Sequence, residues 1–443
     1  MHCPSTPTQF RLFARPLIFK LLSAFCLSAA SLSSAADLPM AEPESEGVSS
    51  ERLQRLPAAM QRYIDNDLLA GTVTLVARNG KVIHLDSQGW KNKEDNAAMT
   101  EDTIFFIMSM TKPIVSTALM MLYEEGHFLL TDPISDWIPE LADKQVIVQD
   151  QYGTHRVPAR QEVTFRHVLA HTAGLDPDPA MLSATERKLL EREDDLESTL
   201  LKRAPLPLAF HPGNDWQYGS STDYVALLVE RIAGEPIQEF LQREIFDPLQ
   251  MSDTFYAVPN NKLDRVATVY SPTGRNNAIE HSRSPDYASK PFFGDNFYGG
   301  IAGLFSTISD YWKFSQMMLN GGELNGVRLL SPKTVNLMIS NHSGDHDVYV
   351  RGPGYTFGLG FGLMSNTGVA RDPLTPGTFT WGGAWGTVFW IDPVENMIGI
   401  MMTQITSYSH LSVRQEVGVT AMQAIVDSYS NAPYQVYGYP VLD

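Results

Sequence analysis

Cysteine is almost absent from this chain of 443 residues, which has only Cys3 and Cys26. Both lie in the first 36 residues, which carry the pattern of a removable leader. A chain without cysteine forms no disulfide, cannot use a thiol as its nucleophile and cannot bind a metal through thiolates. The sequence therefore excludes these three kinds of chemistry for a mature protein that has lost its leader.

Residues 1–36 have the three parts of a secretory signal peptide. Basic residues precede an apolar run from Leu21 to Leu32, and the small residues Ser33–Ala36 follow it. We expect cleavage after Ala35 or Ala36. The apolar run has about 12 residues, whereas a transmembrane helix needs about 20. We therefore expect an exported protein, periplasmic or secreted, with no membrane anchor after cleavage.

Positive charge is also scarce. The chain has 33 Lys and Arg against 50 Asp and Glu, a formal net charge of −17. Three of the basic residues and none of the acidic ones lie in the leader, so its removal leaves −20. Because nucleic acid is a polyanion, we do not expect it as a partner.

Two common hydrolase signatures are missing. Gly-x-Ser-x-Gly occurs nowhere, so the nucleophile elbow of α/β-hydrolases is absent. His167 and His171 are four residues apart, but no Glu follows His167 to complete the metal-binding pattern His-Glu-x-x-His. We expect neither a metal nor an organic cofactor. His342 and His346 lie in a polar loop and are expected to face solvent.

Strand patterns lie near both ends of the chain, and helical patterns dominate the middle. The β-rich runs 72–77 and 81–85 flank Asn79-Gly80, the strongest short hairpin signal. Two further strands are expected at 387–391 and 397–403, and helices at about 50–64 and 413–427. This order predicts one domain, 37–443, in which an α/β lobe (about 37–108 and 299–443) carries an inserted, mostly helical lobe (about 109–298).

The sequence Ser109-Met110-Thr111-Lys112 opens an apolar segment that is expected to form a helix ending at Gly126. Residues three apart share one face of a helix. Serine is a poor nucleophile until a base activates it, and a lysine in a dry pocket can lose its proton and act as that base. This layout is typical of a serine hydrolase whose base is lysine.

Two other elements point to the same cleft. Trp216–Ser220 precedes a helix expected to end at Gly234, so that Tyr218 and Ser220 can both face one cavity. Trp381–Gly386 contains consecutive glycines, which let a substrate lie against the backbone and leave an N–H free for an oxyanion.

Taken in this order, the three elements resemble the serine β-lactamase and penicillin-recognising superfamily, whose signature includes Ser-x-x-Lys. Within it the chain is most similar to the class C-like branch and to the family VIII carboxylesterases. The resemblance covers residues 45–430 and includes Leu169–Leu175 and Gly299–Leu304. It implies a two-lobed β-lactamase/transpeptidase-like fold, with an antiparallel sheet flanked by helices and an inserted helical lobe.

The resemblance also implies roles for single residues. Ser109 would be the acylated nucleophile and Lys112 its proton acceptor, while Tyr218 would pass the proton to the leaving group and then activate water. Ser220, where many members have asparagine, would hydrogen-bond near Lys112 or the substrate. The N–H groups of Ser109 and Ala384 would form the oxyanion hole.

One element departs from the family pattern. Where β-lactamases and penicillin-binding peptidases have a cation, a hydroxyl and then glycine, this chain has Trp381, Gly382 and Gly383. The groups that would receive a substrate carboxylate are missing from this strand. Trp381 and Trp385 could instead form an apolar wall, with core packing as the alternative, and an aromatic group at Phe292, Phe293, Phe297 and Tyr298 could line the entrance.

The resulting hypothesis is a serine hydrolase that cleaves small carboxylic esters, with short acyl chains, through an acyl-enzyme on Ser109. Two alternatives stay open. The first is β-lactam or peptide-amide hydrolysis, including cleavage of D-amino-acid peptides. The second is a sensor on the same fold that is acylated once and does not turn over.

Overall fold

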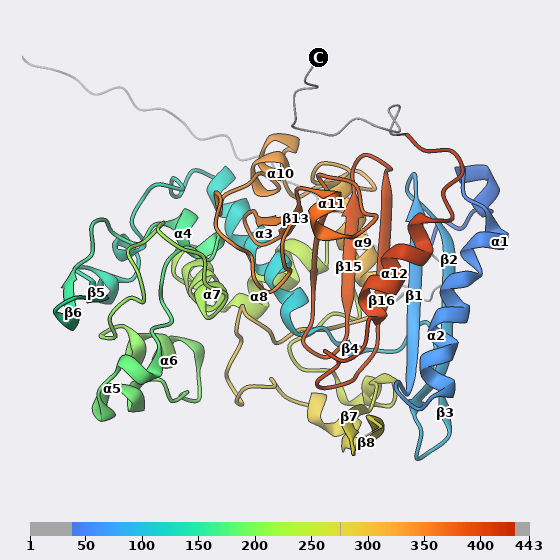
Figure 1. The fold of residues 1–443 in the computed structure, drawn as a ribbon, viewed down its shortest axis with the longest axis horizontal. Helices are drawn as coiled ribbons and strands as arrows, with labels where there is room; N and C mark the ends of the chain where they lie inside the picture. Colours follow the sequence, from blue (N-terminus) through green and yellow to red (C-terminus); the bar gives the residue numbers. More distant parts are fainter. Residues whose placement is uncertain (1–37, 275, 430–443) are drawn as a thin grey trace, which may run out of the picture.

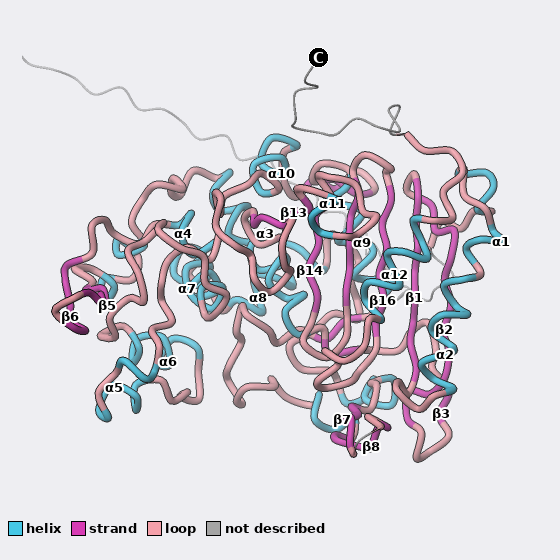
Figure 2. The backbone as a smooth tube through the Cα atoms, viewed as in Figure 1, coloured by secondary structure: helices cyan, strands magenta, loops and turns pink. Residues whose placement is uncertain are grey.

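An antiparallel sheet forms the centre of the protein in the computed structural model, which describes residues 38–274 and 276–429 (Figures 1 and 2). The predicted leader therefore lies outside the described residues. Each pair of neighbouring strands in this sheet is antiparallel. Among the described residues the sheet has eight strands, in the order β12 (Tyr355–Phe357), β13 (Gly362–Met364), β14 (Phe379–Gly382), β15 (Val388–Asp392), β16 (Met397–Met402), β1 (Gly71–Arg78), β2 (Lys81–Asn92) and β3 (Ala97–Ala98).

The predicted hairpin is confirmed as β1 and β2. Asn79 and Gly80 both have positive φ, at 57° and 77°, as the two central residues of a type I′ turn require. The second predicted pair is confirmed as β15 and β16, which are joined by a tight turn. In the sheet β16 pairs with β1, so strands from the two ends of the chain lie side by side.

Terminal helices cover one face of the sheet and a helix from the later half covers the other (Figure 1). The predicted first helix forms as α1 (Ser50–Leu53) and α2 (Arg55–Asp65), and Ser49 caps α1 by accepting from the Arg52 N–H. The predicted last helix, α12, is shorter than expected and runs from Val413 to Met422. It packs against α2, and α9 (Ile308–Leu319) packs against β16, β1 and β15.

Helices and loops make up most of the region between β4 and β9, at the left of Figure 1. In the part of the chain that the structure describes, no helix is long and apolar enough to span a membrane. The remaining α-helices are α3 (Thr111–Glu124), α4 (Phe165–Leu169), α5 (Ala184–Leu189), α6 (Leu196–Arg203), α7 (Ser221–Ala233), α8 (Ile237–Leu241), α10 (Pro332–Met338) and α11 (Thr367–Ala370).

Short strand pairs brace the loops around this region. β4 and β9 pair just before the Ser109 segment and hold it against the loop that precedes α9. The small pairs are β4 (Phe105–Phe106) with β9 (Phe305–Ser306), β5 (Gln145–Asp150) with β6 (Gly153–Pro158), β7 (Val269–Thr273) with β8 (Ala278–Arg283), and β10 (Glu323–Leu324) with β11 (Val327–Arg328).

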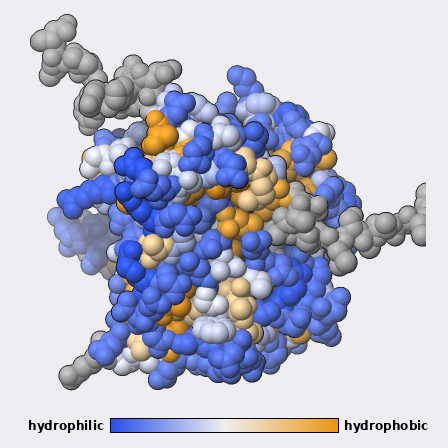
Figure 3. All heavy atoms as spheres, turned by 90° about the vertical axis from the view of Figure 1, so that its right-hand side faces the viewer, coloured by the Kyte–Doolittle hydropathy of each residue, from blue (hydrophilic) through white to orange (hydrophobic). Residues whose placement is uncertain are grey.

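The surface seen from the right-hand side of Figure 1 is mostly hydrophilic, with apolar atoms confined to patches (Figure 3). Beneath the surface, one main apolar core runs through the sheet, α2, α3, α7 and α9.

Arg78, the last residue of β1, ties both ends of the chain to the sheet. Its side chain has no exposed surface, and Nη2 donates to Glu395 Oε2 at 2.7 Å and to the Asp427 carbonyl at 2.8 Å. Its other nitrogens donate to the carbonyls of Glu46, Gly47 and Glu395. Breaking a buried ion pair is costly because it leaves the other charge without a partner.

We expect Arg78→Met to lower the free energy of unfolding by about 3–5 kcal/mol, because it strands the Glu395 carboxylate. The matched control is Arg62→Met, which removes an ion pair to Glu416 in which the Arg62 side chain is 63% exposed. Solvent-exposed ion pairs contribute about 0–1 kcal/mol to the free energy of unfolding. Urea unfolding, followed by circular dichroism, measures the free energy of unfolding of both variants. A small and equal decrease in the two variants would contradict this account of Arg78.

Candidate active site

Ser109 lies in a 3₁₀ turn, Met108–Met110, directly before α3, so the helix expected to open at Ser109 begins at Thr111. Two contacts fix this turn: Tyr311 donates its hydroxyl to the Met110 carbonyl at 3.0 Å, and Leu304 N–H donates to Thr111 Oγ1 at 3.2 Å. Ser109 and Lys112 still lie side by side, as their three-residue spacing predicts, because the 3₁₀ turn leads straight into α3. Ser109 Oγ lies 3.1 Å from Lys112 Nζ.

Lys112 is buried, with 2% of its surface exposed. Its Nζ donates to the Ile301 carbonyl at 2.7 Å and lies 4.6 Å from the centre of the Tyr218 ring. These contacts aim the amine at Ser109. Since a base must lie within hydrogen-bond reach of the proton that it takes, this geometry allows Lys112 to accept the Ser109 hydroxyl proton.

Asp223, in the first turn of α7, holds the loop that carries the Ile301 carbonyl. Its Oδ1 accepts the N–H groups of Gly300 at 2.8 Å and of Ile301 at 3.0 Å. Burial raises the pKa of this carboxyl, while its hydrogen bond from Ile301 and the charge of Lys112 act in the opposite direction. Residue 300 must be glycine, because a Cβ atom at this position would overlap the Thr222 carbonyl. Sequence reasoning missed Asp223, since an acid in the first turn of a helix is common.

Tyr218 is held by aromatic neighbours. Trp381 Nε1 donates to the Tyr218 hydroxyl oxygen at 3.2 Å, which leaves the phenol proton free to be donated elsewhere. The His171 ring packs against the Tyr218 ring at 5.1 Å between centres. Burial, and secondarily the charge of Lys112, lowers the pKa of His171 to about 3, so that this imidazole is neutral at physiological pH.

Ser220 lies at the start of α7 but does not line the same cleft as Ser109. Its N–H donates to Asp176 Oδ2 at 2.8 Å. Within the described ranges its hydroxyl makes no hydrogen bond to Lys112. The adjacent Gly219 is needed because a Cβ there would overlap the Asp176 carboxylate.

The Trp381–Gly386 segment follows β14, whose end lies beside the Ser109 turn. β14 ends at Gly382, and Gly383 N–H donates to the Thr387 carbonyl at 2.9 Å. A Cβ on Gly383 would overlap the Ile107 carbonyl, so glycine permits this close approach to the segment before Ser109. Among the described residues, the Ala384 N–H has no hydrogen-bond acceptor, which leaves it available to an oxyanion.

Ser109 and Tyr218 open onto a cleft of about 180 Å³. It gathers five of the predicted residues and four that the sequence analysis did not single out. The lining is Ser109, Tyr218, Trp381, Gly382 and Ala384, with Val350, Arg351, Tyr408 and Arg414. Arg414, from the first turn of α12, also donates to the Gly383 carbonyl. Positions 381 and 382 of β14 themselves carry neither a cation nor a hydroxyl.

Other residues noted in the sequence have different positions. His342 and His346 are partly buried, which corrects the expectation that they face solvent: their Nε2 atoms lie 2.9 Å from the Leu337 carbonyl and 3.3 Å from the Gly213 carbonyl. His171 lies beyond α4, at φ 59°, so it does not share a helix face with His167. Throughout residues 38–274 and 276–429, no group of three or more His, Cys, Asp or Glu side chains could hold a metal.

The predicted aromatic group is divided between core and surface. Phe297 is buried in the main core, and Phe292 packs against Phe106 and Trp385 in a second apolar cluster. Tyr298 lines a separate groove.

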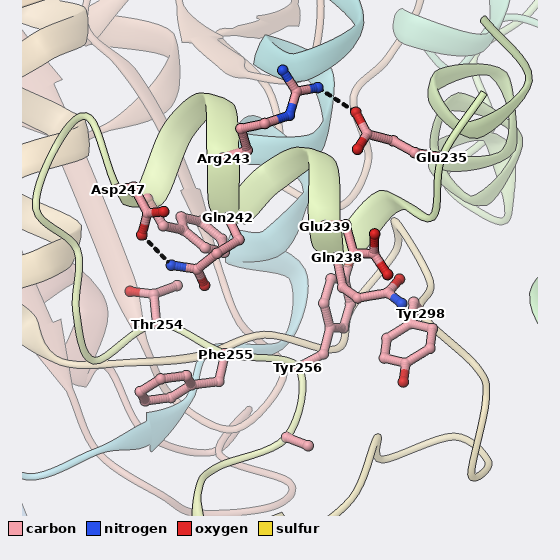
Figure 4. Close-up of a pocket in the computed structure, with 12 residues that line it drawn as sticks. Glu235, Gln238, Glu239, Gln242, Arg243, Asp247, Thr254, Phe255, Tyr256 and Tyr298 are labelled. Atoms are coloured by element: carbon pink, nitrogen blue, oxygen red, sulfur yellow. Dashed lines mark hydrogen bonds and ion pairs between the residues drawn. The ribbon is translucent and has the colours of Figure 1, made fainter. Parts of the chain in front are cut away.

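That groove, of about 560 Å³, lies along α8 and is shown in Figure 4. Among the residues that line it, Arg243 forms an ion pair with Glu235, and the Gln242 amide donates to Asp247 Oδ1 (Figure 4). No lysine lines it, and its hydroxyl groups are those of Thr254 and two tyrosines. It therefore lacks a serine in contact with a lysine, the pair that Ser109 and Lys112 form.

Comparison with known proteins shows the family of this chain. A family model described as Beta-lactamase matches residues 56–416, so the chain belongs to the β-lactamase family. Protein Rv1367c of Mycobacterium tuberculosis (strain ATCC 25618 / H37Rv) is 32% identical over 362 residues, which cover 78% of this chain and 88% of the relative. Esterase EstB of Burkholderia gladioli is 27% identical, with 81% of this chain and 91% of EstB covered.

Among solved structures, EstCE1, described as a hydrolase with promiscuous acyltransferase activity, matches with a TM-score of 0.73 at 25% identity. The match covers 84% of this chain and 99% of EstCE1. The predicted family and the two-lobed β-lactamase-like fold class, with its antiparallel sheet flanked by helices, are thereby confirmed. The protein is a serine hydrolase of the β-lactamase fold.

We expect Asp223→Ala to lower kcat by about 10- to 100-fold, because small displacements of a catalytic group cost that much in rate. Without its carboxylate the Ile301 carbonyl is no longer held and Lys112 loses its anchor. Asp223→Asn, which keeps an oxygen acceptor, should recover part of the loss. Kinetics of a chromogenic ester, normalised to folded protein, measure both variants.

The control is Asp310→Ala on α9. Asp310 is another buried carboxyl that accepts a backbone N–H, that of Asp253 at 2.7 Å, and it does not line the cleft. The Asp310→Ala variant should have a lower melting temperature but a kcat within about 3-fold of the wild-type value, since Asp310 touches no reacting group. If both variants lose activity only in proportion to stability, Asp223 has no positioning role.

Proposed function

We propose that this protein hydrolyses carboxylic esters through an acyl-enzyme on Ser109. The observation that carries the proposal is the contact of Ser109 with Lys112, whose amine is fixed by the Ile301 carbonyl and faces Tyr218. Trp381 and Gly382, in place of a cation and a hydroxyl, favour esters over β-lactams. Two of the similar proteins are named as an esterase and as a hydrolase with acyltransferase activity.

In the first half-reaction, Ser109 Oγ attacks the ester carbonyl carbon while Lys112 takes the hydroxyl proton. The N–H groups of Ser109 and Ala384 stabilise the oxyanion, and losing one such donor typically costs on the order of 100-fold or more in rate. The carbon–oxygen bond to the alcohol then breaks. The departing oxygen receives the proton by way of Tyr218, and Ser109 remains acylated.

In the second half-reaction, water gives a proton to Tyr218 or Lys112 and attacks the acyl carbon. The bond to Ser109 Oγ breaks, and the serine oxygen takes back a proton as the carboxylic acid leaves. Each step conserves protons, and the steps use only Ser109, Lys112, Tyr218 and water. The cleft of about 180 Å³ favours short acyl chains. We also propose that the enzyme works outside the cytoplasm, since its first residues have the pattern of an export signal.

We expect the protein lacking residues 1–36 to turn over 4-nitrophenyl butyrate at a rate at least about 10-fold above that of a chromogenic cephalosporin, and Ser109→Ala to abolish ester turnover. The control is Ser116→Ala, which removes a buried hydroxyl from α3 outside the cleft and should retain turnover. Steady-state absorbance kinetics measure all of these rates.

Comparable turnover of the cephalosporin would transfer the assignment to β-lactam hydrolysis. One stoichiometric release of nitrophenol without further turnover would identify a sensor. Full ester turnover by Ser109→Ala would exclude Ser109 as the nucleophile.

A further inference from the structure

The loop between α10 and β12 places two exposed apolar side chains beside the nucleophile. Residues 341–347 of this loop are polar or glycine, and Val348, Tyr349 and Val350 follow them. Val348 is buried in the main core, whereas Tyr349 is 60% exposed and Val350 is 47% exposed. Val350 also lines the Ser109 cleft. We call the exposed pair, Tyr349 and Val350, the cleft lip.

Tyr349 is held in place although most of its surface is exposed. Its hydroxyl oxygen accepts the Tyr218 N–H at 3.1 Å, and its ring meets the Trp216 ring edge-on, with the ring centres 5.2 Å apart. The Trp216 ring in turn stacks on the Tyr218 ring, at 6.1 Å between centres. Tyr349 is thus attached to the Tyr218 segment both through its hydroxyl and through its ring. Its ring is therefore fixed on the Tyr218 side of the cleft.

A closed turn of the backbone presents the cleft lip. The Val348 carbonyl accepts the N–H groups of Arg351 at 2.9 Å and of Gly352 at 3.0 Å, so that Tyr349 and Val350 lie at the tip of the turn. Gly352 has a φ of 90°, which favours glycine. Backbone groups and the buried Val348 therefore form the turn, and the exposed surfaces of the two lip residues are not needed for it.

The cleft lip differs from ordinary exposed apolar residues, which are common as single side chains on soluble proteins. Its two residues are adjacent, Tyr349 is bonded to the Tyr218 segment, and Val350 borders the nucleophile. Burying apolar surface is favourable, and a surface that is already fixed loses less freedom on binding than a mobile one. The lip is therefore suited to bind an apolar group of the substrate.

The position of the lip selects the alcohol half of the substrate. In the proposed reaction Tyr218 passes a proton to the departing alcohol oxygen, so the alcohol lies on the Tyr218 side of the bond that breaks. The carbonyl oxygen faces the N–H groups of Ser109 and Ala384 instead. Tyr349 is bonded to the Tyr218 N–H, and Val350 lines the same cleft as Tyr218. The group next to the lip is therefore the alcohol and not the acyl chain.

We propose that the cleft lip, Tyr349 and Val350, binds an apolar alcohol group of the substrate ester. This inference rests on the proposed ester hydrolysis and names the substrate class: esters of a short carboxylic acid with a bulky apolar or aromatic alcohol. The Tyr349 ring packs against an aromatic group by its face or edge, and Val350 adds aliphatic contact. The hydrogen bond from the Tyr218 N–H fixes the Tyr349 ring. Both lip residues determine specificity, and neither takes part in the chemistry.

Two pairs of esters separate the two halves of the substrate. The alcohol pair is 4-tert-butylphenyl acetate and phenyl acetate, whose leaving groups have similar acidity. The acyl pair is phenyl butyrate and phenyl acetate. Burying part of a tert-butyl group corresponds to about 10-fold in affinity. We therefore expect the kcat/KM of the wild type to be about 10-fold higher for 4-tert-butylphenyl acetate than for phenyl acetate.

Variants assign this preference to the lip. Tyr349→Ala should reduce the kcat/KM ratio of the alcohol pair by about 5-fold or more, and Val350→Ser by about 3-fold, mainly through KM, because each removes apolar contact. Tyr349→Phe keeps the ring and should retain most of the preference. The ratio of the acyl pair should stay unchanged in all three variants.

Matched controls remove exposed side chains of the same types from other places. Tyr152 is 85% exposed and Val369 is 49% exposed, and neither lines the cleft. Tyr152→Ala and Val369→Ser should leave both ratios unchanged. An alcohol-pair ratio that is the same in the wild type, Tyr349→Ala and Val350→Ser would overturn the proposal. A change confined to the acyl pair would also overturn it.

Binding to Ser109→Ala separates this inference from the proposed function. NMR titration of that variant should show tighter binding of 4-tert-butylphenyl acetate than of phenyl acetate, by about 10-fold. The double variant Ser109→Ala/Tyr349→Ala should lose this difference. Preferential binding without turnover by the wild type would refute ester hydrolysis and keep the apolar subsite. Turnover by the wild type without preferential binding would keep ester hydrolysis and refute the subsite.

A second copy of the chain is the alternative occupant of an exposed apolar lip. Sedimentation of the wild type and of Tyr349→Ala over a range of protein concentrations measures self-association. We expect the two proteins to sediment alike. A dimer that only the wild type forms, together with equal kcat/KM for the two esters of the alcohol pair, would assign the lip to a subunit interface and overturn the proposal.

Discussion

The hydrogen bond from the Lys112 amine to the Ile301 carbonyl is the contact on which the active site depends. Lysine is rarely buried, and this one lies in a helix, α3, whose residues from Thr111 to Leu122 are all buried. The carbonyl holds Nζ within reach of Ser109. Asp223 in turn holds the loop that presents this carbonyl. The Lys112 amine is thus held inside an apolar core with the help of an acid on a neighbouring helix.

The sheet brings the remaining groups to this lysine. β16 pairs with β1, so strands from distant parts of the chain form one surface, and β14 ends beside the Ser109 turn. Gly383 has no side chain to keep the backbone away from Ile107, and the free N–H of Ala384 follows it. α12 packs on the same sheet and delivers Arg414 to the Gly383 carbonyl. The site is therefore assembled from a helix, a strand end and a terminal helix that lie far apart in sequence.

The parts of the fold and site that depend on local patterns could be predicted from the sequence. Asn79-Gly80 specified a hairpin, and the spacing of Ser109 and Lys112 placed their side chains together even though a 3₁₀ turn replaces the first helical turn. Asp223, Arg351 and Arg414 could not be found this way, because what distinguishes them is tertiary: Asp223 is a buried acid under a remote loop, and the two arginines reach the Ser109 cleft from distant segments. The expectation that His342 and His346 face solvent was wrong for the same reason. Their loop is polar in sequence, but in the fold both imidazoles lie against backbone carbonyls of other segments.

Trapping the covalent intermediate tests the central claim most directly. The protein lacking residues 1–36 would be mixed with excess 4-nitrophenyl butyrate, quenched in acid within milliseconds to seconds, and examined by intact-mass and peptide mass spectrometry. The account predicts a butyryl group on the peptide that contains Ser109, at that residue and at no other. Ester turnover with no acyl group at any time point, or with the acyl group on a different residue, would contradict it.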